Sequence, residues 1–170
     1  MLVFVFSILE ISRSYAETRH ELKVAIENAI IFKNKILTVK PCYPDSYSTS
    51  WTNCIGEMVY ESGTKYLGEF KNGRTNGYGK YIRLDGGGYI GQSKNGLLHG
   101  NGTHVYNYGT IYSGQWKKNK WHGLGVFKPY KGFRGQWKQG HGSITIYDDR
   151  PIEGYFENGK FLYASERGGG

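Results

Sequence analysis

The 170-residue chain is long enough for one domain, and it combines 26 glycines with 15 tyrosines, 8 phenylalanines and 4 tryptophans. This aromatic content excludes a disordered linker, and only 4 prolines exclude collagen, so the composition indicates short strands joined by tight turns. The formal net charge of +8 indicates a solvated basic face or attraction to an acidic surface, and no run of four basic residues marks a polybasic motif.

Residues 1–16 are predicted to be a signal peptide or a hydrophobic N-terminal segment. Leu2 to Leu9 is mostly apolar, and Ser14 and Ala16 place small residues at the −3 and −1 positions of a cleavage site. The apolar run is too short to cross a bilayer, which takes about 20 residues. We therefore expect export to a periplasm or the cell exterior, with an uncleaved membrane-associated anchor or a mis-assigned start as alternatives.

Residues 17–54 are expected to form an N-terminal helix and a cysteine-bounded cap. From Glu21 to Leu37, apolar residues recur at helical spacing and predict a short amphipathic helix. These residues are Leu22, Ala25, Ile26, Ala29 and Ile30. We expect the helix to pack on the end of the main domain, with a membrane-surface role as the alternative.

The cap contains both cysteines, Cys42 and Cys54. In an exported protein they are expected to pair, which closes a turn-rich loop and stabilises the fold by about 2–3 kcal/mol. In a cytosolic protein they would instead be free thiols. The chain has no CxxC or Cys/His ligand spacing, so we expect no zinc site.

Residues 55–161 contain a repeated pattern. Copies of Tyr-x-Gly begin at Tyr66, Tyr89 and Tyr112, so the period is 23 residues twice (89 − 66 and 112 − 89). Each copy continues to a Gly-x-Gly pair, and Asn-Gly at 72–73 and 95–96 predicts tight turns. A shortened fourth copy begins at Phe133, and Ile152 begins a last half-unit.

These units resemble the MORN repeat family, whose pattern is Tyr-x-Gly-x-Trp/Phe-x-x-Gly, a short turn, and Gly-x-Gly. The resemblance covers about residues 55–161 and departs from the pattern at Ser93 and in the short fourth turn. It implies a mainly β fold, an elongated single-layer antiparallel sheet of successive β-hairpins (a MORN solenoid) after the short helix. The cap and Phe161 to Gly170 are expected to shield the two ends of the sheet, and residues 162–170 to be a flexible tail.

Glycines in this pattern are expected to leave space for aromatic rings. Because side chains alternate between the faces of a strand, Tyr66, Gly68 and Phe70 share one face. Neighbouring rings can then lie over the bare backbone. The predicted structural glycines are Gly68, Gly77, Gly79, Gly91, Gly100, Gly102, Gly114, Gly123, Gly125 and Gly135.

The leading functional prediction is a non-catalytic binding or scaffold protein. The resemblance implies association with a protein or an anionic membrane surface; we expect no nucleic acid, and the oligomeric state stays open. A carbohydrate or cell-envelope binding module is an alternative, as is an accessory module related to the MORN regions of lipid kinases. The residues predicted to face a partner are Tyr66, Tyr89, Tyr112, Trp116, Trp121 and Trp137.

No catalytic residue, cofactor or metal is predicted. Gly86 to Gly91 fits GxGxxG, but no helical pattern follows it. His99, His122 and His141 recur before a repeat glycine, yet successive units stand about 9–10 Å apart, too far for shared zinc ligation. No nucleophile–base–acid set and no kinase motif is present, so we expect no enzymatic activity.

Overall fold

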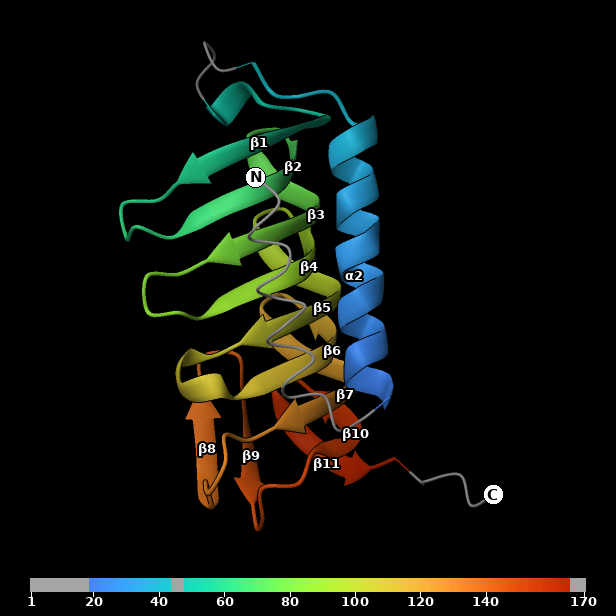
Figure 1. Ribbon diagram of the computed structural model, residues 1–170, viewed down its shortest axis with the longest axis vertical. Helices are drawn as coiled ribbons and strands as arrows, with labels where there is room; N and C mark the ends of the chain where they lie inside the picture. Colours follow the sequence, from blue (N-terminus) through green and yellow to red (C-terminus); the bar gives the residue numbers. More distant parts are fainter. Residues whose placement is uncertain (1–18, 44–47, 166–170) are drawn as a thin grey trace.

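The computed structural model describes residues 19–43 and 48–165, so the predicted N-terminal segment, residues 1–16, lies outside the described residues. The described part of the chain forms one helix, two short 3-10 turns and an eleven-stranded sheet (Figure 1). The elements are α2 (Arg19–Thr38), η1 (Ser48–Ser50), β1 (Cys54–Val59), β2 (Lys65–Lys71), β3 (Arg74–Ile82), β4 (Gly88–Lys94), β5 (Leu97–Val105), η2 (Asn107–Gly109), β6 (Ile111–Lys117), β7 (Lys120–Lys128), β8 (Gly135–Gln139), β9 (Gly142–Ile146), β10 (Ile152–Glu157) and β11 (Lys160–Ala164).

The sheet confirms the predicted mainly β fold of successive hairpins. Strands β1 to β7 follow one another in chain order, and every neighbouring pair among them is antiparallel. Two-residue turns join the strands at one long edge, here called the tight-turn edge. Asn72 and Asn95 open two of these turns with φ of 51° and 53°, a conformation that asparagine tolerates. Longer loops join the strands at the opposite, long-loop edge.

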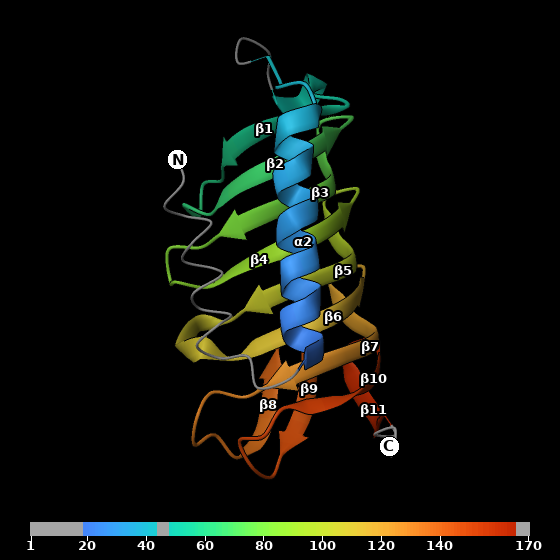
Figure 2. The same ribbon diagram turned by 45° about the vertical axis from the view of Figure 1, so that its right-hand side comes forward.

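Helix α2 covers the predicted residues 21–37 but does not lie at the end of the domain. It runs lengthwise over one face of the sheet and contacts β3, β4, β5 and β6 (Figures 1 and 2). The buried side chains on this face include Ile90, Thr103, Ser113 and Val126. The hydroxyls of Thr103 and Ser113 lie 2.8 Å apart on it. Phe32 of the helix is buried, whereas Ile30, predicted on the apolar side, is 54% exposed. Among the described residues, no helix combines the length and apolar character needed to span a membrane.

A row of glycines crosses the sheet, one from each of β1 to β7 and one from β10, each opposite the next. Its members are Gly56, Gly68, Gly79, Gly91, Gly102, Gly114, Gly125 and Gly154. Because glycine has no side chain, a ring can lie directly against the backbone of this row. A Cβ atom added to Gly102 would collide with the Tyr89 ring, and one added to Gly125 would collide with the Tyr112 ring.

The hydroxyl group of each repeat tyrosine is held by a hydrogen bond to the backbone of its own strand. The hydroxyls of Tyr66, Tyr89 and Tyr112 donate to the backbone carbonyl three residues ahead, at 3.0, 2.7 and 2.9 Å. At these accepting residues the pairing of the hairpin shifts in register, which marks a β-bulge. A bulge removes backbone groups from the ladder, so the tyrosine hydroxyl satisfies a carbonyl that the bulge releases.

The side chain of the residue at each bulge accepts a hydrogen bond from a backbone N–H of the return strand. The carboxylate of Glu69 accepts from the backbone N–H of Tyr78 at 2.7 Å. The amides of Gln92 and Gln115 accept in the same way from the residues nine positions ahead, at 2.8 and 3.2 Å. A side chain at Gly100 would occupy the place of the Gln92 amide, and this glycine has a φ of +63°. The first glycine of each Gly-x-Gly pair therefore accommodates the bulge.

The predicted fourth unit does not pair next to β7; its strands β8 and β9 join the far end of the sheet, where β9 pairs with β11 in parallel, unlike the antiparallel pairing predicted for the whole sheet. Strand β10, not β8, pairs with β7, and its Gly154 faces Gly125. Between earlier units, the repeat tyrosine comes 8 residues after the aromatic residue near the end of the preceding return strand, as Tyr89 does after Tyr81 (89 − 81). Phe133 comes only 6 residues after the corresponding Phe127 (133 − 127). The loop is thus two residues too short for Phe133 to return in register. Ile152 takes the position instead, 40 residues after Tyr112 (152 − 112), and so follows an insertion of 17 residues (40 − 23).

The inserted hairpin consists of β8 and β9 and folds over the sheet face opposite α2 (Figure 1). Gly135, predicted as a repeat glycine, lies outside the glycine row, because it faces Ile146 in this hairpin and nothing approaches its Cβ position. Backbone hydrogen bonds between successive tight turns confirm that the hairpin β10–β11 takes the position of the next repeat unit after β6–β7. Gly96 N–H donates to Thr75 and Gly159 N–H donates to Trp121, each to the second residue after the previous tight turn.

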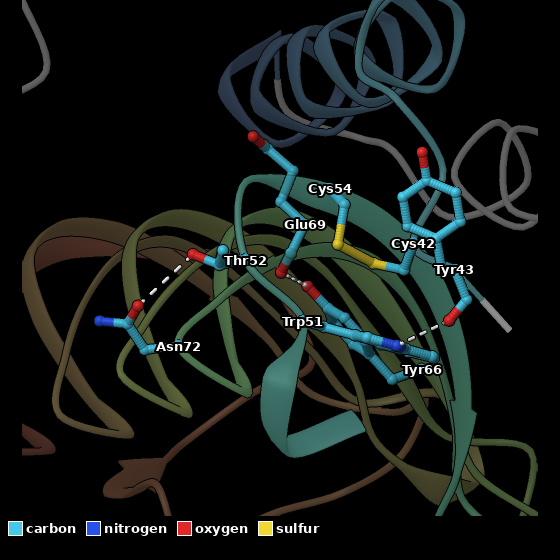
Figure 3. The surroundings of a disulfide bond; sticks show 8 residues. All are labelled: Cys42, Tyr43, Trp51, Thr52, Cys54, Tyr66, Glu69 and Asn72. Atoms are coloured by element: carbon cyan, nitrogen blue, oxygen red, sulfur yellow. Dashed lines mark hydrogen bonds between the residues drawn. A yellow bond between two sulfur atoms is a disulfide. The ribbon is translucent and has the colours of Figure 1, made fainter. Parts of the chain in front are cut away.

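The cysteine-bounded cap covers the first edge of the sheet. Cys42 and Cys54 form a disulfide (Figure 3), and the N–H of Cys42 donates to the carbonyl of Ile55 on the outer edge of β1 at 2.7 Å. Trp51 packs edge-on against Phe70 with ring centroids 4.9 Å apart. The cap thus satisfies an otherwise free strand edge and covers the first aromatic rings.

The other end of the sheet is ordered further than predicted. Residues 162–164, assigned to a flexible tail, belong to β11, which pairs with β10 through Tyr155 and Tyr163. Beyond them, the N–H of Ser165 donates to the carbonyl of Glu153 at 3.1 Å. Residues 166–170 lie outside the described residues.

Replacement of Gly114 by valine should lower the free energy of unfolding by about 1–3 kcal/mol, as overpacking does. A Cβ atom there would strike the backbone of Gly125 and approach the Tyr112 hydroxyl to 3.1 Å. Gly140→Val is the matched control, because Gly140 has open space around it. Urea denaturation measures both; equal stability of the two variants would contradict the packing assigned to the row.

Candidate binding surfaces

The six aromatic residues predicted to face a partner are buried, and this corrects the prediction. Tyr66, Tyr89, Tyr112, Trp116, Trp121 and Trp137 are each at most 6% exposed. They pack on one another because the bare glycine row lets the rings lie close to the backbone. Trp121 stacks on Tyr112 at 4.7 Å and on Trp137 at 4.9 Å. These rings form the core and are not a binding face.

The inserted hairpin covers this core near its C-terminal end. Trp137, Ile144 and Ile146 come from β8 and β9 and are buried in the same cluster as Trp121. The indole N–H of Trp121 donates to the hydroxyl of Tyr106 at 3.1 Å, so the buried ring keeps a hydrogen-bond partner. Both faces of the sheet are therefore largely covered, by α2 on one side and by the cap and the inserted hairpin on the other.

Exposed cations gather at the tight-turn edge. They are Lys71, Arg74, Lys94, Lys117, Lys118 and Lys120, named here the basic edge, and all are exposed. Within residues 19–43 and 48–165, none of the six forms an ion pair. The pKa of nearby His99 is lowered, first by burial and then by Lys94 and Lys117. The edge is thus a strip of uncompensated positive charge.

The long-loop edge carries exposed apolar side chains instead. Leu84 is 82% exposed and Tyr108 is 85% exposed, each in the loop that follows a return strand. Sequence reasoning missed this row because its members occupy different positions in successive loops. The basic and the apolar rows therefore lie at opposite edges of the molecule.

A polar cavity of about 250 Å³ lies where the inserted hairpin meets the sheet. One wall comes from the loop after β3, where Arg83 and Asp85 form an ion pair at 2.8 Å. The backbone N–H of Gly87 donates to the same carboxylate at 3.0 Å. The opposite wall comes from the turn between β8 and β9, with Gln139 and His141.

Two histidines line this cavity. His104 occupies the position of Tyr81 and Phe127 in the neighbouring units, 23 residues from each (104 − 81 and 127 − 104), and its ring lies 5.1 Å from that of His141. Burial lowers the pKa of His104 to about 3, with a further contribution from His141. Burial also lowers the pKa of His141, whose Nδ1 lies 2.7 Å from the carbonyl oxygen of Asn119. Both imidazoles are therefore neutral at pH 7.

Sequence reasoning did not single out His104, although a histidine at an aromatic repeat position is a readable signal. It did single out His99, His122 and His141, and only His141 reaches the cavity. Within the described ranges, no group of three or more His, Cys, Asp or Glu side chains is arranged to hold a metal ion. The cavity thus offers hydrogen bonds rather than a ready ligand set for a metal.

Replacement of Trp137 by alanine should lower the free energy of unfolding by about 3–5 kcal/mol, because it removes a ring stacked in the core. The neighbouring Gln136 is exposed, so Gln136→Ala is the matched control and should change stability little. Chemical denaturation of both variants checks this. If Trp137→Ala were as stable as Gln136→Ala, the hairpin would not close the core.

Acid should destabilise the fold through His104. The denatured chain protonates this histidine near pH 6.5, while the folded protein does so only near a pKa of about 3. The denatured state therefore binds more protons in between, and stability falls as pH falls, by up to about 1.4 kcal/mol per unit. His104→Phe, which copies Phe127, should flatten the pH dependence of urea denaturation between about pH 7 and pH 5. An unchanged slope would contradict the assigned burial.

Comparison with protein-family models finds the MORN repeat in three consecutive segments, residues 66–88, 89–110 and 112–128. A comparison with curated proteins gives no significant match. The three segments correspond to the hairpins β2–β3, β4–β5 and β6–β7, and the matches end where the inserted hairpin begins. The glycine row, the repeat tyrosines and these three matches show that the chain contains three consecutive MORN repeats over residues 66–128.

Proposed function

We propose that this protein is a non-catalytic binding scaffold whose basic edge docks on an acidic protein surface. One observation carries the proposal: six exposed cations follow one edge of a regular sheet, and none is neutralised by an ion pair within the described residues. Such a strip attracts an acidic partner over a distance of about 10 Å and orients it.

The regular fold supports a scaffold role. Adjacent hairpins present Lys71, Lys94 and Lys117 from equivalent ends of strands, and the spacing between successive hairpins is fixed by backbone pairing. Each hairpin adds two strands, so charged groups recur about every 9–10 Å. A rigid row of charges of this kind suits an extended acidic segment, because the backbone that carries the basic side chains loses little conformational freedom on binding.

A protein partner is favoured over a bilayer by the separation of the two exposed rows. Stable attachment to a membrane usually combines positive charge with an apolar group that inserts beside it. Here Leu84 and Tyr108 lie at the long-loop edge, away from the six cations of the basic edge. The basic edge is therefore suited to an acidic protein surface more than to an acyl-chain boundary.

Export, or association with a membrane, belongs to the same proposal. The apolar stretch from Leu2 to Leu9 supports it, because such a stretch is typical of a secretory segment. The disulfide between Cys42 and Cys54 also supports it, since disulfides persist mainly in oxidising compartments. The acidic partner is accordingly sought outside the cytosol or at a membrane surface.

Charge reversal tests the basic edge. The triple variant Lys117→Glu, Lys118→Glu, Lys120→Glu should weaken binding of a poly-glutamate peptide at least about tenfold, because it replaces attraction by repulsion. The control Lys33→Glu, Lys65→Glu, Lys131→Glu changes the net charge equally at exposed sites away from this edge. Fluorescence anisotropy at low and at physiological salt measures both variants.

Equal loss of peptide binding in the two triple variants would show that only net charge matters and would overturn the docking site. Vesicles containing phosphatidylserine provide the second arm. If the natural protein bound these vesicles but not the peptide, and the basic-edge variant abolished that binding, the proposed partner class would be wrong.

A further inference from the structure

We propose that the cavity between the β3–β4 loop and the inserted hairpin binds a neutral, polyhydroxylated molecule of the size of one sugar ring. The proposal is independent of the basic edge, because none of the six cations of that edge lines the cavity. It gives the inserted hairpin a second role besides closing the core.

The insertion builds this cavity from segments that a regular repeat would keep apart. Arg83 and Asp85 come from the loop after β3, His104 comes from β5, and Gln139 and His141 come from the inserted turn. The turn is fixed there, since Lys120 Nζ donates to the carbonyl of Gly140. A volume of about 250 Å³ lies below the roughly 300–1,000 Å³ of drug-sized sites, so it fits one small molecule.

The Arg83–Asp85 pair retains hydrogen-bonding capacity for hydroxyl groups. Arg83 uses two of its guanidinium hydrogens on Asp85, at 3.2 Å from Nε and 2.8 Å from Nη2. A guanidinium carries five such hydrogens, so three remain. Asp85 accepts these two bonds and one from Gly87, which leaves acceptor capacity on the carboxylate. A pair of adjacent hydroxyls can accept from Arg83 and donate to Asp85 together.

His104 supplies the observation that points most directly to a ligand. It is 5% exposed, it lines the cavity, and its Nδ1 has no hydrogen-bond partner among the described residues. An unsatisfied buried polar atom destabilises the unliganded protein, so a group that bonds to it on binding relieves that cost. A hydroxyl suits either tautomer of the neutral ring, because it both donates and accepts.

The charge balance of the cavity favours a neutral ligand. Arg83 is matched by Asp85, and both histidines have lowered pKa values because they are buried. An anion would find the guanidinium already paired, and a cation would find no free carboxylate among the residues that line the cavity. His104 and Tyr106 also line the cavity, with ring centroids 4.1 Å apart and planes tilted by 32°, and their carbon edges offer apolar contact to the C–H groups of a sugar.

Nuclear magnetic resonance of the histidine side chains in the full-length protein tests the site. Methyl glycosides of glucose, galactose and N-acetylglucosamine are titrated to about 50 mM, since a site this small is expected to bind with a dissociation constant of roughly 1 mM. At least one glycoside should shift the His104 and His141 signals saturably, while His99 stays unchanged.

Two matched pairs of variants locate the binding. Arg83→Gln should weaken it at least tenfold, whereas Arg74→Gln at the basic edge should not. Gln139→Ala should weaken it and Gln136→Ala, on the same strand but outside the cavity, should not. Circular dichroism checks folding, and if Arg83→Gln were unfolded, the glutamine pair decides.

The proposal is overturned if no glycoside moves the two signals, or if inorganic phosphate moves them and the glycosides do not. It is also overturned if binding survives both Arg83→Gln and Gln139→Ala. The double charge reversal Lys117→Glu, Lys118→Glu removes positive charge from the basic edge and leaves Lys120 in place, so it should weaken docking and leave glycoside binding unchanged. Failure of this proposal and failure of the docking proposal can therefore be told apart.

Discussion

The fold depends on one packing contact, a tyrosine ring lying over a pair of facing glycines. Tyr89 lies against Gly102, and its hydroxyl donates to the carbonyl of Gln92 at the bulge. The same contact recurs for Tyr66 and Tyr112, so each of the three hairpins is stabilised by its own tyrosine. Because the ring spans both strands of a hairpin and touches the rings of its neighbours, local geometry and long-range packing are stabilised together.

This contact also determines which surfaces remain free. Rings that close over the glycine row are buried, so the face that is richest in aromatics is unavailable to a partner. Helix α2 covers the opposite face through β3 to β6. Interaction is therefore left mainly to the edges, where the turns place lysines on one side and apolar side chains on the other. The insertion adds a cavity where the regular repeat ends.

Much of the fold could be predicted because the repeat is local. The spacing of Tyr66, Tyr89 and Tyr112 indicated the hairpins, and the facing glycines indicated where rings would lie. The order of the last strands could not be predicted from the motif alone, since Phe133 copies the pattern while a loop two residues too short prevents its pairing. The burial of Trp137 and the lengthwise position of α2 depend on contacts between distant segments, which periodicity does not encode. His104 was missed because it replaces an aromatic residue within an otherwise regular strand.

The most direct measurement of the central contact is the chemical shift of the glycine α protons. A proton that lies over the face of an aromatic ring resonates upfield, so we expect marked upfield shifts for Gly79, Gly102 and Gly125, which lie under Tyr66, Tyr89 and Tyr112. Tyr89→Leu should remove the shift at Gly102 and preserve those at the other two glycines. Unshifted α protons at all three glycines would contradict the ring-over-glycine packing on which the fold is explained.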